Sequence, residues 1–308
     1  MEFAVNYSAA AANLLREGRI EFDRFKCPAW PDLIATAREL HAVYVHLPLR
    51  VGAGIGTAIN TETRQPADWR QLEPLLSQTD TPQVNTHLAP LTDDFPGIPV
   101  ATTEPAYIEA LLAHALRDVQ ALVARFGPER VTVENADDGK GLILQPALQP
   151  DFIRRVVEEA GCRFLLDIAH ARLAAHLLGL DARTYIARLP LGRISEIHLA
   201  GIQPFQGHWS TLMHQPGLSQ EDLGWFAGLQ PGQWMDHLPL LDGDWEFYAW
   251  ALEQVHLGRW GQPWILTLEH GGVGRLWELL TDQAALAEQV PRLSAMVKNP
   301  VADNRGSQ

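Results

Sequence analysis

The sequence predicts an α/β fold, a single (β/α)8 TIM barrel. Short apolar runs rich in β-branched residues alternate with longer helical patterns, which is typical of βα units and a parallel sheet. Eight such runs occur, the number that closes a barrel. The length of 308 residues is normal for one barrel of this kind.

The predicted strands are the β-rich runs, in chain order. They span residues 3–6, 23–26, 43–46, 84–87, 131–134, 164–167, 194–198 and 265–269. The clearest helical pattern follows the fourth strand, at residues 104–126, and ends at a Gly-Pro pair. Further helices are predicted at residues 31–40, 150–160, 169–178, 244–255 and 276–297.

A long insertion, at about residues 200–262, precedes the last strand. It is rich in Gly, Gln, Pro and Trp, which favours either a functional lid or a structural cover for the barrel mouth. We expect residues 1–298 to form one domain that includes this insertion. Residues 299–308 are polar and are predicted to form a flexible C-terminal tail.

The composition argues against several classes of partner. The net charge of −13 disfavours nucleic acid and anionic membrane surfaces, which basic faces bind. The first residues lack a basic, then apolar, targeting pattern, and no segment approaches the ~20 apolar residues of a membrane span. Cys27 and Cys162 are too few for a disulfide framework. We therefore expect a cytoplasmic protein with no nucleic-acid or membrane partner.

Common nucleotide and nucleophile motifs are not found. Residues 51–56, Val-Gly-Ala-Gly-Ile-Gly, follow a strand but lack the spacing of a dinucleotide fingerprint or a P-loop. We interpret this segment as a flexible loop near the barrel mouth. No Gly-x-Ser-x-Gly elbow occurs either.

Six consecutive predicted strands end in a residue that can bind a metal. These residues are His46, His87, Glu134, Asp167, His198 and Glu269. In a barrel such strand ends converge on one face, where barrel enzymes place their sites. Imidazole and carboxylate groups suit Zn, Fe and Mn, and converging carboxylates need a cation to offset their repulsion. A single strand-end His is usually structural, but six in succession predict a metal site.

Further candidates lie close to these strand ends. His170 follows Asp167 by about one helical turn, and Asp236 and His237 lie in the insertion, so all three are candidate metal ligands. Glu134, Glu269 and His198 are also the candidate catalytic residues. The candidate substrate-binding residues are Asn135, His270 and Trp234.

At these residues the chain resembles the xylose isomerase-like TIM-barrel superfamily. That superfamily includes sugar isomerases and epimerases, nucleases of the endonuclease IV type, and multinuclear non-heme iron oxidases such as the methanobactin-biosynthesis oxidase. The sugar isomerases use a Glu, Asp, His, Glu set for one metal, and the resemblance implies that set here in Glu134, Asp167, His198 and Glu269. The additional histidines imply two or three metals.

Two branches of this superfamily resemble particular segments. Asp167 and His170 look like an endonuclease IV pair that ligates different zinc ions, although Asp236 and His237 are adjacent where that family has Asp-x-His. The oxidases are similar in Glu134-Asn135, in Glu-Ile-His-Leu-Ala-Gly at residues 196–201 and in a His at position 176. They often carry Asn where this chain has His170. Because the net charge disfavours a nuclease, the oxidase resemblance is the stronger.

The resemblance implies a multinuclear non-heme iron oxidase or oxygenase that acts on a peptide or small molecule. Glu134 would bridge one iron held by His46 and His87 and another held by Asp167, His198 and Glu269, and His170 and His237 would hold a third. Two or three divalent metals are expected, with iron favoured and zinc or manganese as alternatives, and a partner protein would deliver the substrate. The alternatives are a sugar or sugar-phosphate isomerase or epimerase, an endonuclease IV-like hydrolase and a non-catalytic metal-binding barrel.

Overall fold

The computed structural model describes residues 1–137, 141–212, 214–220 and 229–298. Within these residues all eight predicted strands are present as neighbours in one curled sheet, which confirms the barrel prediction. The eight are β1 (Glu2–Asn6), β2 (Arg24–Pro28), β3 (Val43–His46), β6 (Val84–Leu88), β7 (Val131–Asn135), β8 (Arg163–Asp167), β9 (Ile194–Leu199) and β12 (Ile265–Leu268). Two short strands, β4 (Leu49–Val51) and β5 (Ile59–Asn60), extend one end of the sheet.

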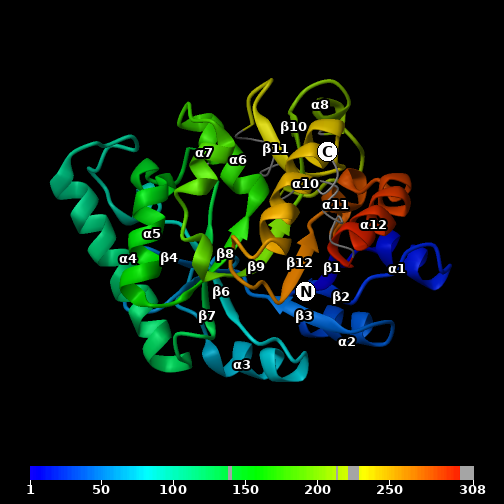
Figure 1. Cartoon of the computed structure of the whole chain (residues 1–308), viewed down its shortest axis with the longest axis horizontal. Helices are drawn as coiled ribbons and strands as arrows, with labels where there is room; N and C mark the ends of the chain where they lie inside the picture. The colour runs from blue at the N-terminus through cyan, green and yellow to red at the C-terminus, as the bar shows by residue number, and fades with distance from the viewer. Residues whose placement is uncertain (138–140, 213, 221–228, 299–308) are drawn as a thin grey trace, which may run out of the picture.

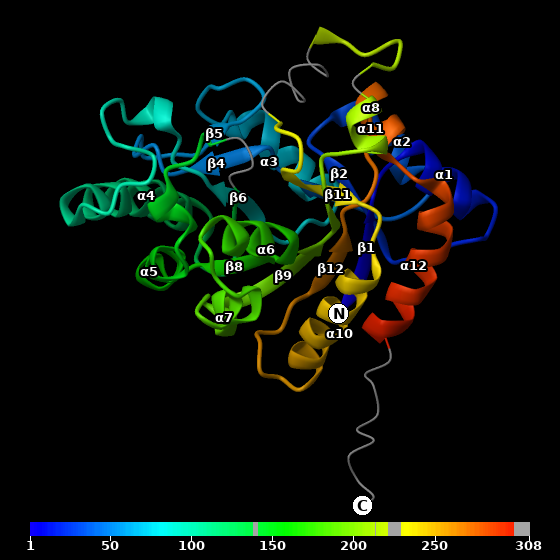
Figure 2. The ribbon, with the colours of Figure 1, turned by 90° about the horizontal axis from the view of Figure 1, so that it is seen from above.

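Helices cover the outside of the sheet. In both views, α4 and α5 lie on one side of the molecule and α1 and α12 on the other (Figures 1 and 2). The α-helices outside the insertion are α1 (Ala9–Arg16), α2 (Pro31–Arg38), α3 (Trp69–Gln78), α4 (Pro105–Phe126), α5 (Pro150–Ala160), α6 (Ile168–Leu177), α7 (Ala182–Ala187), α11 (Arg275–Leu280) and α12 (Gln283–Lys298). Short 3-10 helices are η1 (Thr92–Asp94), η2 (Gln145–Leu148) and η3 (Leu191–Arg193).

Alternation along each strand separates an outer from an inner face. In β7, Val131 and Val133 belong to the main hydrophobic core, and Glu134 is buried on the other face of the strand. In β12, Leu266 and Leu268 belong to the same core. Because successive side chains point to opposite faces, a candidate ligand such as Glu134, next to the core residue Val133, points into the barrel and not toward the helices.

The chain itself joins the two ends of the sheet, because only residues 47–48 separate β3 from β4. β3 pairs with β2, and β4 pairs in parallel with β6. At this junction the side chain of Asn85 donates to the Leu47 carbonyl at 3.2 Å and accepts from the Leu47 N–H at 2.8 Å. The amide of Asn85 therefore takes the place of strand pairing next to Pro48, which has no N–H to donate.

The single helix predicted at residues 276–297 is wrong, because α11 and α12 are separate. Asp282 lies between them, and its N–H donates to His270 Nε2 at 3.0 Å. The Asp282 carboxylate accepts from the Ala285 N–H at 2.9 Å, so this residue caps the second helix. Among the described helices, none is long and apolar enough to cross a membrane.

Helices α1, α3 and α7 are not among the sequence predictions. Each has ten residues or fewer, so its apolar periodicity extends over few turns. Each begins with a side-chain cap, supplied by Ser8, Asp68 and Asp181 respectively. Those capping residues are the signal that sequence reasoning missed.

The insertion contains a small antiparallel sheet of β10 (Gly201–Pro204) and β11 (Trp234–Leu238), with α8 (His208–Leu212) between them. The helix predicted at 244–255 is confirmed as α10 (Asp242–His256). This small sheet packs through a second hydrophobic cluster, which consists of Phe205, Leu212, Met235, Leu238, Leu276 and Leu280. The predicted tail, residues 299–308, and parts of the insertion at 213 and 221–228 lie outside the described residues.

The loop at residues 51–56 is held in place, so the prediction of a flexible loop is wrong. The buried carboxylate of Asp118 in α4 accepts from the N–H groups of Gly52, Gly54 and Gly56 at 3.0, 2.8 and 2.7 Å. All three glycines have positive φ, which turns successive amides toward one anion. At Gly54 an added Cβ would also overlap His114, so only glycine fits there.

Candidate metal centre

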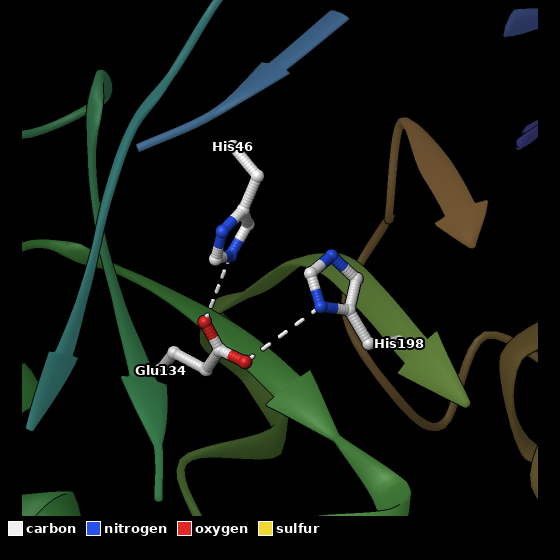
Figure 3. A group of neighbouring side chains, drawn as sticks. All are labelled: His46, Glu134 and His198. Atoms are coloured by element: carbon white, nitrogen blue, oxygen red, sulfur yellow. Dashed lines mark hydrogen bonds and ion pairs between the residues drawn. The ribbon is translucent and has the colours of Figure 1, made fainter. Parts of the chain in front are cut away.

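Glu134 lies at the centre of the converging strand ends, with 1% of its surface exposed. Its Oε2 is 3.1 Å from His46 Nε2 and 3.3 Å from His87 Nε2. Its Oε1 is 3.6 Å from His198 Nδ1 and 3.7 Å from His170 Nδ1. Figure 3 shows His46 and His198 on the two sides of this carboxylate. The arrangement suits a carboxylate that bridges two cations.

The protonation state of Glu134 also suits that role. Burial raises the pKa of its carboxyl group, but the neighbouring side chains of His87, His198 and His46 hold it well below the ordinary value. The group is therefore an ionised carboxylate, the form that binds metals.

The other hydrogen bonds of the histidines fix which ring nitrogen faces the cluster. The Nδ1 atoms of His87, His170 and His237 lie 3.3, 3.0 and 3.1 Å from the carbonyl oxygens of Leu49, Asn135 and Glu269. A carbonyl oxygen only accepts, so each Nδ1 carries the proton and each Nε2 is left as a ligand atom. Backbone carbonyls hold metal-binding histidines in this way in many proteins.

His198 is oriented in the opposite sense. Its Nε2 donates to Glu196 Oε1 at 2.8 Å, so Nδ1 faces the cluster and lies 2.9 Å from Glu269 Oε1. Among the described residues, neither His198 Nδ1 nor Glu269 Oε1 makes a hydrogen bond of normal geometry, although both atoms are buried. A buried imidazole nitrogen and a buried carboxylate oxygen that converge in this way are expected where a cation binds. Asp167, His198 and Glu269 have ligand atoms within 4.8 Å of one another.

Asp167 links the end of β8 to the start of α6. One carboxylate oxygen accepts from the His170 N–H at 2.7 Å and so caps the helix. The other oxygen lies 3.7 Å from His170 Nδ1. The structure therefore brings these two residues together.

Asp236 and His237 both face the cluster although they are adjacent in β11. His170 Nε2 is 3.1 Å from Asp236 Oδ2, and His237 Nε2 is 3.8 Å from the same oxygen. Neighbouring residues of a regular strand point to opposite faces, so this arrangement needs a break in the strand. His237 provides this break, because its φ of +58° is a left-handed conformation that is uncommon outside glycine. This explains how an adjacent pair replaces an Asp-x-His spacing.

The residues present fit divalent metal ions. The candidate ligands form overlapping groups, each with ligand atoms within 4.8 Å: His46, Glu134 and His198; Glu134, Asp167 and His170; Asp167, His198 and Glu269; and His170, Asp236 and His237. His87 adds a further nitrogen at the Glu134 side. All nine residues predicted as metal ligands are thus brought together.

Two of the predicted substrate-binding residues have other roles. Asn135 is fully buried; its side chain donates to the Asp167 carbonyl at 2.8 Å and accepts from the Asp167 N–H at 3.0 Å. His270 is also fully buried; its Nδ1 donates to the His237 carbonyl at 3.0 Å and its Nε2 accepts from Asp282. Because these side-chain groups are engaged with backbone, the structure places both residues where they position candidate ligands.

The third predicted substrate-binding residue, Trp234, is 38% exposed at the start of β11. Its ring packs against that of His176, with ring centroids 5.9 Å apart. It is not among the residues that line the two cavities at the cluster. The structure therefore does not bring it together with the other site residues.

Sequence reasoning missed two residues inside the barrel. Lys26 in β2 forms an ion pair with Glu269. Glu196 in β9 holds His198, and its position two residues before that histidine, on the same face of the strand, was an available signal. For Lys26 the signal was a lysine placed between the buried residues Phe25 and Cys27.

Two cavities meet at the cluster. The larger, about 670 Å³, is lined by polar residues that include Arg50, Asn60, Thr61 and Arg64, besides Glu134 and other candidate ligands. The smaller, about 260 Å³, is lined partly by aromatic residues that include Tyr7, Trp30 and Trp277. Lys26, His46, His87 and His237 line both. A substrate in either cavity reaches the same groups.

Two solved structures with the same fold align with this chain over almost its whole length. A xylose isomerase domain-containing protein from Salmonella typhimurium aligns with a TM-score of 0.53 at 14% identity, over 97% of each chain. D-psicose 3-epimerase in the presence of D-fructose aligns with a TM-score of 0.51 at 12% identity, over 96% of this chain and 99% of the epimerase. These structural similarities show that the chain has the fold of a xylose isomerase-like TIM barrel.

Curated relatives are proteins of the UPF0276 group. One from Bordetella pertussis is 29% identical over 171 residues, which cover 54% of this chain and 55% of the relative. One from Acaryochloris marina is 30% identical over 158 residues, which cover 48% of this chain and 54% of the relative. The chain spans about half the length of the curated relatives it matches.

A family model gives the most specific match. The model described as RiPP precursor modification enzyme MbnB/TglH/ChrH matches residues 28–216, more than half of the chain. The matched residues contain the candidate ligands of β3, β6, β7, β8, α6 and β9. The chain therefore belongs to the MbnB/TglH/ChrH family of RiPP precursor modification enzymes.

Proposed function

We propose that this chain is a multinuclear non-heme iron oxidase or oxygenase that modifies a peptide. The observation that carries the proposal is the position of Glu134 among four histidines, with more carboxylate and imidazole groups around it than one metal needs. The family, whose described members modify peptide precursors, supports a peptide substrate.

In this proposal the distances between ligand atoms assign the ligands to three sets. His46 and His87 face one oxygen of Glu134. His198 faces the other oxygen together with Glu269, and Asp167 belongs to the same group. His170, Asp236 and His237 form the third set. When bound there, iron with an open coordination position supplies O2-dependent oxidation chemistry.

The residues of the chain supply orientation and a dry environment. Glu134, Asp167 and His198 are each at most 1% exposed, so these ligands are shielded from bulk solvent. Asn60, Thr61 and Arg64 line the same cavity as His87 and offer polar and positively charged groups to a peptide. We also propose that a partner protein delivers this peptide.

The test is metal analysis of protein loaded with Fe(II) without oxygen, followed by O2 uptake with a peptide encoded beside the gene. We expect two or three iron ions per chain and peptide-dependent uptake. Glu134→Gln should sharply reduce the metal content, because it removes the bridging charge. Glu129→Gln, at a mostly exposed ion pair with Arg163, is the control and should keep it. Unchanged metal content in Glu134→Gln would contradict the bridging role of Glu134.

A metal-dependent sugar isomerase or epimerase is the second candidate. The observation in its favour is that Asp167, His198 and Glu269 converge within 4.8 Å, with Glu134 3.6 Å from His198. A metal held there polarises a carbonyl group. One manganese or magnesium ion per chain together with sugar turnover would favour this candidate over the oxidase.

A further inference from the structure

The smaller cavity beside the cluster has a largely aromatic and apolar wall. Three aromatic rings contribute to it, Tyr7, Trp30 and Trp277, and they come from segments after β1, before α2 and within α11. Proline and aliphatic side chains also line it: Pro28, Leu47, Pro48 and Val273. A wall of this composition suits an apolar group, in contrast to the polar lining of the larger cavity.

Trp30 is held in place at this wall although its side chain is 40% exposed. Its backbone N–H donates to the Pro28 carbonyl at 2.8 Å. Its indole Nε1 donates to Glu62 Oε1 at 2.9 Å, and Glu62 lies in the turn that follows β5. Because both the backbone and the ring are hydrogen-bonded, the ring is pre-organised before a ligand arrives. Tryptophan is also a residue type that often dominates binding.

Trp277 is placed at the same cavity by a close backbone approach. An added Cβ on Gly272 would lie 2.9 Å from the Trp277 ring, so the ring packs directly on the backbone of this glycine. Gly272 is not among the glycines with positive φ, so glycine is needed here for space. The Trp277 ring also contacts the His237 ring, with centroids 5.4 Å apart. The aromatic wall therefore reaches a candidate metal ligand.

The size and position of the cavity define what fits. Its volume is about 260 Å³. Since an apolar cavity of about 150 Å³ holds a benzene molecule, this one has room for a single side chain as large as an indole. His46, His87 and His237 line both cavities, so a group in the smaller one lies beside the candidate ligands. The larger cavity, about 670 Å³, leaves room for the adjoining peptide.

We infer that the smaller cavity is a subsite for one aromatic side chain of the peptide, next to the residue that reacts at the centre, with Trp30 as a specificity-determining residue. The inference rests on the peptide substrate proposed above and adds the class of side chain that the chain selects. Aromatic rings gain affinity from edge-to-face and offset contacts beyond the area they bury, which favours them over aliphatic side chains. A polar side chain would lose its hydrogen bonds to water.

The test measures binding of capped amino acids, each of which presents one side chain between two amide groups. The N-acetyl amides of tryptophan, phenylalanine and glutamine are titrated into the full-length chain, with and without Zn(II), and ligand-observed NMR gives each Kd. We expect both aromatic amides to bind with a millimolar Kd, as is usual for ligands of this size, and the glutamine amide not to bind.

Variants locate the binding. Trp30→Ala removes one ring of the wall and should weaken binding of the aromatic amides by about 2–10-fold. Val273→Phe should abolish it by filling the cavity. Tyr107→Ala is the matched control, because Tyr107 in α4 is also 40% exposed and lines neither cavity, so this variant should bind like wild type. Circular dichroism establishes that each variant is folded, and Trp30→Ala decides if Val273→Phe does not fold.

The outcomes separate this inference from the proposed function. Aromatic amides that bind no better than the glutamine amide, or that bind wild type and Trp30→Ala equally, overturn the subsite and leave the metal-dependent function in place. D-fructose that binds instead of the amides, and less tightly to Trp30→Ala, also overturns it. If the chain binds no metal and still binds the aromatic amides in this cavity, the proposed function fails while the subsite stands.

Discussion

Individual buried polar side chains set the geometry of the candidate metal centre by hydrogen bonding to backbone groups. The amide of Asn135 spans both backbone groups of Asp167, and the ring of His270 joins the His237 carbonyl to the Asp282 N–H. Each side chain is hydrogen-bonded to backbone and so fixes a candidate ligand. Positioning of this kind is what keeps metal ligands within tenths of an ångström of their required places.

Replacing Asn135 tests this positioning role. Asn135→Ala leaves the buried N–H and C=O of Asp167 without their side-chain partners, which should reduce the free energy of unfolding by about 2–5 kcal/mol. The metal content should fall as well, since Asp167 is then free to move. Urea unfolding and elemental analysis measure both. Asn13→Ala, at an exposed side chain on α1, should change neither. A destabilised variant with full metal content would make Asn135 purely structural.

The two cysteines predict a dependence of stability on alkaline pH. Burial raises the pKa of the Cys27 and Cys162 thiols to about 12, above the ordinary value of about 8.5. The folded state therefore binds these protons more tightly, and its advantage is complete below pH ~8.5 and is lost as the pH rises toward 12. At pH 8 a thiol reagent should find no fast-reacting cysteine in native protein and two after denaturation. A fast-reacting thiol in native protein would contradict this burial.

At the scale of elements, one helix holds the glycine-rich loop that follows β4. Asp118 of α4 receives three loop N–H groups, and the His114 ring lies 3.2 Å from the Ala53 carbonyl through Nδ1. β4 leads directly into this loop and closes the barrel against β6. Anchoring of the loop therefore also supports the wall of the larger cavity, to which Arg50 of β4 belongs.

Removing the anchor should release the loop. Asp118→Ala leaves the N–H groups of Gly52, Gly54 and Gly56 without their carboxylate, which should cost about 3–5 kcal/mol of unfolding free energy. Hydrogen exchange of residues 51–56 should become faster, while exchange in α12 should change little. Glu109→Ala, which removes an exposed ion pair with Arg155, should leave both unchanged. Unaltered exchange in the loop would show that other contacts hold it.

At the scale of the whole molecule, the candidate ligands connect many separate elements of the barrel. They come from β3, β6, β7, β8, α6 and β9, from the residue that follows β12, and from β11 of the insertion. Bound metal would therefore link segments that are far apart in the chain. A ligand that binds only the folded state stabilises that state by an amount set by its concentration and affinity.

Removal of metal should accordingly lower the melting temperature. With free metal about 100-fold above its Kd, the stabilisation is about 2.7 kcal/mol, which corresponds to about 4 °C for a domain of this size. Calorimetry with and without a chelator measures the difference. Glu134→Gln should melt at the same temperature with and without the chelator, because it holds little metal. A wild-type melting temperature that does not respond to the chelator would argue against metals that link the strands.

The sequence alone determined the barrel and most of the centre, because both follow from local periodicity. Residues of a strand alternate between two faces, so a polar residue at the end of an apolar run is directed into the barrel, as at His46 and Glu134. Tertiary structure decided which backbone groups approach from distant positions. It placed Asn135 and His270 against backbone, brought Lys26 to Glu269, and turned Asp236 and His237 to one side through a left-handed residue. Contacts of this kind depend on segments that fold together from far apart in the chain, so no local pattern encodes them.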